Sequence, residues 1–169
     1  MRQVIVIRHA IAQDPEAAAA AGLADAERVL TTAGRHEMSA VARGLAVLVP
    51  ELELIFSSPL RRARQTADIV AAAFTGLSVE ETEALSPGAP PASLYRQLAA
   101  GPRCVAIVGH EPMLGKWVSR SLTFGQFSFI RFEKGGACLL AFPAVPEHAQ
   151  AELCWFCPPA VLRRLAKGV

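Results

Sequence analysis

Two arginines and two histidines follow apolar segments that have the composition of buried strands: Arg8, His9, Arg62 and His110. Residues 4–7 are four β-branched residues in a row, and they end directly at Arg8 and His9. In an open parallel sheet, ligands bind at the edge where the strands end. Guanidinium groups fork onto phosphate oxygens, and helix N-termini add amide donors. The four side chains therefore predict a pocket for a tetrahedral dianion such as a phosphoryl group.

Each of these residues also has an ordinary structural explanation. A single buried histidine is more often a hydrogen-bonded core residue than a functional one, and the cluster of Arg61, Arg62 and Arg64 fits a solvated helix face. The coincidence of such residues at three strand ends is what favours a common site. Carboxylates are sparse at these ends, which argues against a magnesium or calcium site. The sequence predicts no metal and no cofactor.

Alternating strands and helices must position these side chains. Short runs rich in Val and Ile predict buried strands at residues 4–7, 52–56 and 104–108. Residues 11–28 predict a loop or a weak helix over the sheet edge. The first helix is predicted at 31–48, capped by Thr31 or Thr32 and stopped by Pro50. A second helix is predicted to begin at Ser58, with Pro59 in its first turn. Further helices are predicted at 92–100, from Pro112 onward and at 161–167.

The pattern changes near the C-terminal end of the chain. Residues 127–132 and 137–142 predict a β-hairpin around a turn at 133–136, and residues 153–156 predict a third strand beside it. A short edge strand is predicted at 77–79. We therefore expect one domain over residues 1–169, an α/β three-layer α/β/α sandwich with a mostly parallel central sheet and an antiparallel edge hairpin.

Composition excludes several classes of partner. The net charge of +2 is too small to indicate nucleic acid or a membrane surface, and no apolar run approaches the roughly 18 residues that span a bilayer. Arg8 interrupts the N-terminal apolar run too early for a signal peptide, so we expect a cytoplasmic protein. The sequence leaves the oligomeric state open.

Cysteine spacing gives one further motif, Cys154-Trp-Phe-Cys157. A redox C-x-x-C normally opens a helix, whose dipole lowers the thiol pKa, whereas this one closes an apolar, strand-like stretch. No second cysteine or histidine pair completes a zinc site. We interpret the four cysteines, at positions 104, 138, 154 and 157, as structural.

Three motifs together resemble those of the histidine phosphatase superfamily, which includes the phosphoglycerate mutases. They are Arg8-His9-Ala10, residues 57–67 (SSPLRRARQTA) and residues 108–112 (VGHEP). Within that superfamily the chain is most similar to the small phosphohistidine phosphatases of the SixA type. The resemblance runs from residue 2 to about residue 142 and implies a phosphoglycerate mutase-like fold.

The resemblance also implies a role for each matching residue. His9 would be the nucleophile and would become transiently phosphorylated. Arg8 and Arg62 would hold the equatorial oxygens, Arg62 being chosen over Arg61 because it directly precedes Ala63. His110 would be the second pocket histidine. Ser57 is a further candidate for phosphate binding, and Glu83 and Asp14 are the candidates for a general acid.

The sequence around Glu83 fits the acid motif of the family poorly, and this bears on the substrate. Weak acid catalysis matters greatly for an alkyl phosphate ester but less for phosphohistidine, whose P–N bond is labile. The leading hypothesis is a metal-independent phosphatase that acts on phosphohistidine in a signalling protein through phospho-His9. The alternatives are a phosphatase of small phosphomonoesters or nucleotides and a non-catalytic phosphate-recognition module. In each case the partner is phosphate or a phosphorylated protein or small molecule.

Overall fold

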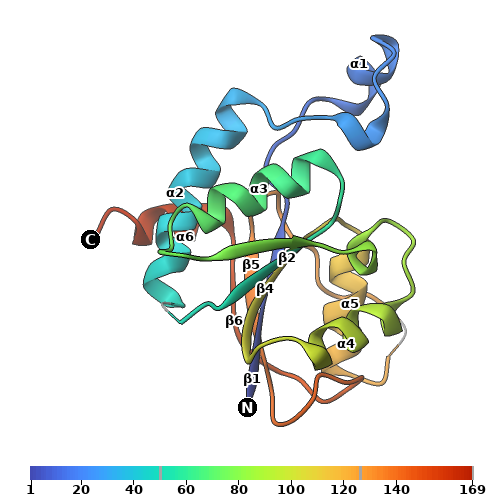
Figure 1. The fold of residues 1–169 in the computed structure, drawn as a ribbon, viewed down its shortest axis with the longest axis vertical. Coiled ribbons are helices and arrows are strands. Elements are labelled where there is room, and N and C mark those ends of the chain that lie inside the picture. The colour runs from blue at the N-terminus through green and yellow to red at the C-terminus, as the bar shows by residue number, and fades with distance from the viewer. Residues whose placement is uncertain (50, 126, 169) are drawn as a thin grey trace.

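A six-stranded sheet forms the centre of the computed structural model, which describes residues 1–49, 51–125 and 127–168 (Figure 1). Its strands are β1 (Arg2–Arg8), β2 (Leu54–Ser57), β3 (Ser78–Glu81), β4 (Cys104–Gly109), β5 (Ala137–Phe142) and β6 (Glu152–Cys157). The helices are α1 (Pro15–Ala20), α2 (Thr32–Leu48), α3 (Arg61–Ala71), α4 (Pro91–Ala100), α5 (Met113–Leu122) and α6 (Pro159–Leu165), with short 3-10 helices η1 (Asp25–Glu27) and η2 (Glu83–Leu85).

The strand order, β3-β2-β4-β1-β5-β6, places the three strands predicted to carry the site side by side. β1, β2, β3 and β4 are parallel, and β5 and β6 are antiparallel additions at one edge. The register sets Arg8 opposite Gly109 and Ser57 opposite Val108. The ends of β1, β2 and β4 therefore lie in one row, which is the arrangement that the sequence predicted.

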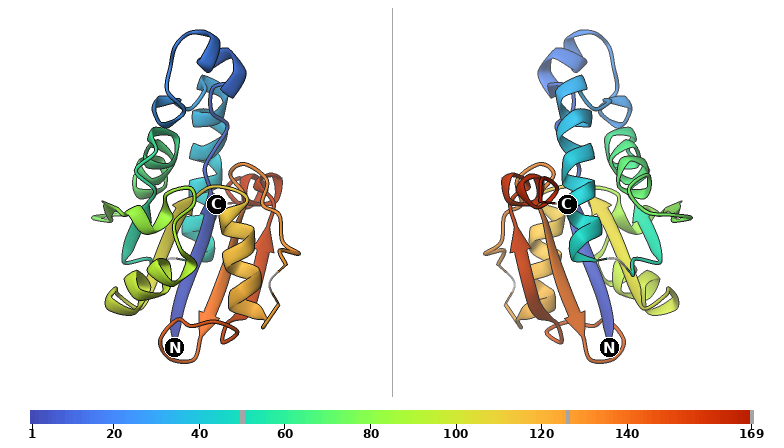
Figure 2. Two further views of the ribbon diagram at one scale, coloured as in Figure 1. Left: turned by 90° about the vertical axis from the view of Figure 1, so that its right-hand side faces the viewer. Right: turned by 90° about the vertical axis from the view of Figure 1, so that its left-hand side faces the viewer.

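Helices cover both faces of the sheet, as Figure 2 shows. The alternating residues of β1 divide between the faces: Ile5 and Ile7 pack with α2, α3 and α6, and Val4 and Val6 pack with α4 and α5. A strand buried on both faces needs an unbroken apolar run, because its successive side chains point alternately into the two cores. The three-layer α/β/α sandwich with a mostly parallel sheet is confirmed.

Residues 13–28 form an arm that projects beyond the sheet edge (Figures 1 and 2). A bridge between Ala12 and Leu30 closes its base. The arm contains α1, whose first turn is capped because the Asp14 carboxylate accepts from the backbone N–H groups of Glu16 and Ala17. α2 begins directly after the arm with Thr31 as its N-cap. A Cβ on Gly34 would collide with the Ile11 carbonyl, so only glycine lets α2 approach the segment after His9 this closely.

Two of the predicted boundaries are wrong. Residues 127–132 form no strand, because the N–H groups of Phe129 and Phe132 donate to the side chains of Ser119 and Glu111 instead of to a neighbouring strand. The antiparallel hairpin consists of β5 and β6. Helix α3 begins at Arg61 rather than at Ser58, and its N-cap, Leu60, makes no side-chain cap bond.

The predicted helix stop at Pro50 lies outside the described residues; α2 ends at Leu48. None of the helices that the structure describes combines the length and the apolar composition needed to cross a membrane. Cys104 and Cys138 are buried, while Cys154 and Cys157 lie in β6, and all four thiols are free.

Candidate active site

The four side chains predicted to form the site meet at the sheet edge, and we call them the quartet: Arg8, His9, Arg62 and His110. Arg8 ends β1, His110 directly follows β4, and Arg62 lies in the first turn of α3. The exposed fractions of His9, Arg62 and His110 are 6%, 5% and 4%. The two imidazole rings lie 5.1 Å apart between centroids, tilted by 53°. Arg8 is partly buried. Placing two guanidinium charges together away from water is costly unless anions reach them.

The geometry of His9 suits a nucleophile. Its Nδ1 lies 2.8 Å from the carbonyl oxygen of Ala10. Because a carbonyl only accepts, Nδ1 carries the proton and Nε2 keeps its lone pair. Burial first, and then the charges of Arg62 and Arg8, lower the pKa of His9 to about 4. The imidazole is therefore neutral at physiological pH.

Thr66 ties the segment after His9 to helix α3. Its hydroxyl accepts from the Ala10 N–H at 3.0 Å and donates to the Arg62 carbonyl at 2.7 Å. The N–H of His9 itself donates to the Gly109 carbonyl of β4. These bonds fix the backbone of His9 against both neighbouring elements, so that its ring has a defined position relative to Arg62 and His110.

His110 faces His9 with one nitrogen bound and one free. Its Nε2 lies 2.8 Å from the hydroxyl of Ser58, which also accepts from the Leu60 N–H and can donate to Nε2. In that tautomer Nδ1 carries a proton and has no acceptor. Burial, then His9 and Arg62, lower the pKa of His110 to about 3. His110 is thus a neutral hydrogen-bond donor.

Arg8 is held through the loop that precedes β5. Its Nη1 donates to the Phe132 carbonyl at 2.6 Å, and the Phe132 N–H donates to the Glu111 carboxylate at 2.8 Å. Burial lowers the pKa of Arg8, and the charge of Glu111 opposes that shift. Glu111 therefore supports Arg8 in two ways: it fixes the backbone that Arg8 binds, and it balances part of its charge.

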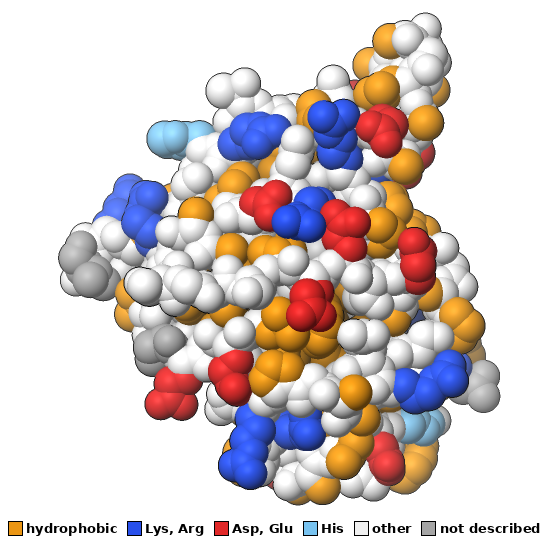
Figure 3. Space-filling model, in the orientation of Figure 1, with side chains coloured by type: hydrophobic (Ala, Val, Ile, Leu, Met, Phe, Trp, Pro, Cys, Tyr) orange, Lys and Arg blue, Asp and Glu red, His pale blue; other side chains and the backbone are white. Residues whose placement is uncertain are grey.

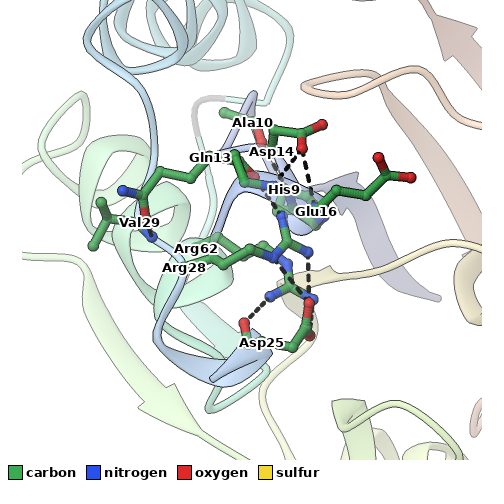
Figure 4. Close-up of polar contacts among 10 residues, drawn as sticks. His9, Ala10, Gln13, Asp14, Glu16, Asp25, Arg28, Val29 and Arg62 are labelled. Atoms are coloured by element: carbon green, nitrogen blue, oxygen red, sulfur yellow. Dashed lines mark hydrogen bonds and ion pairs between the residues drawn. The ribbon is translucent and has the colours of Figure 1, made fainter. Parts of the chain in front are cut away.

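Arg62 binds the arm through Asp25 (Figure 4). Its Nη1 donates to the Asp25 backbone carbonyl at 2.7 Å, and its Nη2 lies 3.0 Å from the Asp25 carboxylate. Arg28 binds the other oxygen of the same carboxylate at 2.8 Å. Burial pushes the pKa of Asp25 up, but the two guanidinium groups together hold it below its usual range. A carboxylate thus occupies one end of the guanidinium fork.

Among the described residues, four buried side-chain nitrogens have no hydrogen-bond partner: Nε of Arg8, Nε of Arg62, Nδ1 of His110 and Nε1 of Trp117. Three of the four belong to the quartet. A buried donor without a partner costs about 1–3 kcal/mol, so native proteins rarely leave several together. Bound oxyanion oxygens would give these three groups acceptors, and the quartet therefore has the character of an anion site.

The structure does not bring the other predicted residues to the quartet in the expected way. The Ser57 hydroxyl donates to the Ser58 carbonyl, and Ser58 contacts His110 instead. The Glu83 carboxylate accepts from the Ser86 hydroxyl on the outer side of η2, and Asp14 is the cap of α1. Sequence reasoning missed Ser58, Thr66, Asp25 and Glu111. Of these, Ser58 and Glu111 are direct neighbours of residues it had chosen, whereas Asp25 had no local signal.

Acidic partners also neutralise the arginines that flank Arg62 in sequence. Arg61 pairs with Glu27, and Arg64 pairs with Asp68 and Glu81. Figure 3 shows acidic and basic side chains interleaved over the α3 and β3 surface, not one continuous basic patch. No group of three or more His, Cys, Asp or Glu residues in the described ranges is arranged to hold a metal ion.

Two hollows flank the quartet. One of about 360 Å³ borders His110 and is lined mainly by apolar residues between η2, α4 and α5; we call it the apolar pocket. The other, of about 710 Å³, borders Arg8 and carries the charged side chains of Glu37, Arg131, Glu133, Lys134 and Arg163; we call it the basic groove.

Comparisons with known proteins agree with this geometry. Residues 4–86 match the model of the histidine phosphatase superfamily (branch 1). An uncharacterized protein of Picosynechococcus sp. is 40% identical over 128 residues, which cover 73% of this chain and 74% of that protein. The structure of the protein histidine phosphatase SixA complexed with tungstate superposes with a TM-score of 0.77 at 25% identity, covering 95% of this chain and 99% of that chain. The SixA protein of Agrobacterium tumefaciens gives a TM-score of 0.73 at 24% identity, covering 94% and 98%.

The fold and the site define a phosphatase of the α/β class, and the chain belongs to the histidine phosphatase superfamily. Within that superfamily its fold is SixA-like. The three sequence motifs that resembled this family are the segments that build the sheet edge described above.

Proposed function

We propose that this protein is a metal-independent phosphohistidine phosphatase, a single catalytic domain that forms a phospho-His9 intermediate. The observation that carries the proposal is the quartet itself: a neutral imidazole with a free Nε2, beside two arginines and a second imidazole that each keep one buried nitrogen without a protein partner. The arginines provide the positive charge that phosphoryl transfer requires. Tungstate is a tetrahedral oxyanion, and the SixA structure complexed with it supports a fold of this kind that binds an oxyanion.

The first step is an in-line attack. The lone pair of His9 Nε2 forms a bond to phosphorus while the bond from phosphorus to the leaving group breaks, and the leaving atom takes that electron pair. Arg8, Arg62 and Nδ1–H of His110 bind the equatorial oxygens, where charge accumulates. In the second step a water molecule attacks phospho-His9, inorganic phosphate leaves, and Nε2 regains its lone pair.

The placement of the acids favours a P–N substrate. Glu83 and Asp14 are engaged elsewhere, and Asp25, the carboxylate beside Arg62, is ion-paired to two arginines that lower its pKa. A carboxylate in that state is a poor proton donor. A phosphorylated imidazole whose distal nitrogen is protonated leaves as a neutral ring and needs no proton from the protein. An alkoxide leaving group would need one.

We further propose a phosphorylated signalling protein as the source of the phosphohistidine, and a cytoplasmic location. Arg131 and Lys134 beside the site suit an acidic protein surface, while the low net charge gives no support for nucleic acid. Four free thiols are typical of proteins from a reducing compartment.

Trapping the intermediate tests the proposal. Wild type and His9→Ala are mixed with a phosphohistidine protein carrying a labelled phosphoryl group and quenched, with the exposed His36→Ala variant as a matched control. We expect a base-stable, acid-labile label on wild type and on His36→Ala, none on His9→Ala, and turnover lowered by at least about a thousandfold in His9→Ala. Phosphate binding without any labelled enzyme would instead identify a recognition module. Faster turnover of sugar phosphates than of the phosphohistidine protein would identify a phosphomonoesterase.

A further inference from the structure

The apolar pocket begins where the phosphoryl site ends, because His110 belongs to both. It lies between the 84–91 segment with the first turn of α4 on one side, and the Glu111–Trp117 turn and helix on the other. Figure 1 shows α4 and α5 beside each other on the same face of the sheet. A group that leaves phosphorus on the His110 side of the quartet would enter this pocket directly.

The walls of the pocket offer few polar groups to a sugar or a polyol. They consist of proline and alanine side chains from the loop, together with Leu94, Met113 and the indole of Trp117. The carboxylate of Glu111 already accepts from the backbone N–H groups of Phe132 and Gly115. Apart from Nδ1 of His110, which belongs to the quartet, Nε1–H of Trp117 is the buried donor in this lining that has no partner among the described residues. It could serve one hydroxyl of a sugar, while the others would lose hydrogen bonds to water without replacing them, which costs about 1–3 kcal/mol for each buried group.

Flat, weakly polar rings suit the same walls. Aromatic faces and thioether sulfur both bind rings favourably. A volume of about 360 Å³ holds a ring with a short attached chain, and it is too small for a folded peptide segment. Lys116 lies in the lining of the pocket and is exposed, so its ammonium group can bind an anionic group at the rim.

We propose that the apolar pocket is the leaving-group subsite and that it selects an imidazole or aryl ring carrying a nearby anionic group, with Lys116 as the partner of that anion. This inference rests on the proposed function, because it assigns the ring that departs from phosphorus. When the P–N bond breaks, the ring nitrogen takes the electron pair, and the neutral imidazole remains in the pocket until water has attacked phospho-His9.

The test uses three small substrates that share one phosphoryl group. Phosphoramidate has no ring, phosphoimidazole has a ring, and glycerol 3-phosphate has a polar body. In the wild type we expect kcat/KM for phosphoimidazole to exceed that for glycerol 3-phosphate by about a hundredfold or more.

Two variants block the pocket from opposite walls, Met113→Trp and Pro87→Phe. For each we expect the ratio of kcat/KM for phosphoimidazole to that for phosphoramidate to fall at least about tenfold. Ser93→Trp is the matched control, because Ser93 lies on α4 but faces the surface hollow on the opposite side of the 84–91 segment. It should leave the ratio unchanged. Lys116→Gln should raise KM for a phosphorylated histidine that keeps its carboxylate more than for phosphoimidazole.

The outcomes separate this inference from the proposed function. An unchanged ratio in both blocking variants, or a wild-type preference for glycerol 3-phosphate, would overturn the pocket assignment even though phosphoramidate still labels His9. Failure of phosphoramidate and phosphoimidazole alike to label wild-type enzyme would overturn the proposed function, and the pocket assignment with it.

Discussion

The apolar pocket and the basic groove border the same quartet, yet they differ in chemistry and in how they can select a substrate. The pocket is narrow, apolar and adjacent to His110, whereas the groove is about twice as large, charged and adjacent to Arg8. The pocket can select a substrate only by direct contact, because burial of an apolar ring stabilises binding by removing that ring from water. Charge acts over a longer range in the groove, because the field of Arg131 and Lys134 extends about a Debye length into solvent.

This difference suggests a division of labour around one chemical centre. The quartet treats every phosphoryl group alike, so discrimination has to come from its two flanks. We infer that the pocket selects the leaving group and that the groove binds the surface of the protein that carries the phosphoryl group. On this view phosphohistidine in an acidic protein surface satisfies both flanks, whereas a free sugar phosphate satisfies neither.

Among the variants outside the quartet, Glu111→Ala should have the largest effect, because Glu111 lines the pocket and binds Phe132 in the lining of the groove. Glu111→Ala removes the acceptor of the Phe132 N–H and so releases the carbonyl that holds Arg8. We expect kcat for phosphoramidate and phosphoimidazole to fall together by about tenfold to a hundredfold. Glu111→Gln, which keeps an acceptor, should recover part of the loss, and Glu133→Ala in the groove should have little effect. A loss confined to phosphoimidazole would show that Glu111 serves the pocket alone.

The pH dependence of stability tests whether the two buried imidazoles are neutral. Their folded pKa values, about 4 for His9 and about 3 for His110, lie below the ordinary 6.5 of an unfolded histidine. Between pH 6.5 and the folded pKa values, the unfolded chain therefore binds more protons than the folded chain. Stability is highest well above pH 6.5 and is lost as the pH falls toward 4 and 3, by an amount on the order of 3 kcal/mol for each ring between pH 7 and 4.

Urea unfolding at pH 7, 6, 5 and 4 measures this loss, and NMR titration of the ring protons locates each pKa. His110→Asn should be less sensitive to pH than the wild type over the same range, while the exposed His36→Asn should match the wild type. Ordinary titration of His9 near pH 6.5 would contradict the neutral nucleophile.

Asp25 should have a smaller effect on anion binding. Asp25→Asn removes the charge that competes for Nη2 of Arg62, while the backbone carbonyl that holds Nη1 remains. We expect tungstate to bind about threefold to tenfold more tightly, as measured by calorimetry. Glu27→Gln, in the same 3-10 helix but paired with Arg61, is the control. Weaker tungstate binding in Asp25→Asn would mean that the carboxylate is needed to orient Arg62.

The smallest effect on small substrates should come from the groove. Replacing Arg131 and Lys134 together by Gln should change kcat/KM for phosphoimidazole by less than about twofold. For an acidic phosphohistidine protein we expect kcat/KM to fall about threefold to tenfold at low salt, and its dependence on ionic strength to weaken. An equal loss on both substrates would place these two side chains in the phosphoryl site itself.

Much of the fold could be predicted from sequence, because its signals are local. The run of β-branched residues at 4–7 predicts that β1 is buried on both faces. The N-cap of α2 is Thr31, one of the two candidates, Thr31 and Thr32, that the sequence offered. Arg8, His9 and His110 end or follow their strands directly. A parallel sheet brings such ends together whatever their separation in the chain, so these three residues were predictable from strand boundaries. Arg62 lies in α3 and was predicted from the family resemblance of residues 57–67.

Where a backbone group binds a distant side chain, the local signal fails. Residues 127–132 alternate like a strand, but their amides donate to Ser119 and Glu111. Ser58 and Pro59 are typical of a helix start, yet the Ser58 hydroxyl binds His110 and the helix begins three residues later, at Arg61. Neither partner can be read from the sequence next to the segment concerned.

The sequence by itself predicted the layer architecture and three of the residues at the sheet edge, Arg8, His9 and His110, because periodicity and strand ends are properties of short segments. Arg62 was predicted from the family resemblance. Only the tertiary structure decided what surrounds those residues. Asp25 reaches Arg62 across 37 positions through a projecting arm, and Glu111 reaches Arg8 through the backbone of Phe132. The two flanks likewise form only where helices and loops pack, since a pocket is a property of the space between elements and not of any one of them.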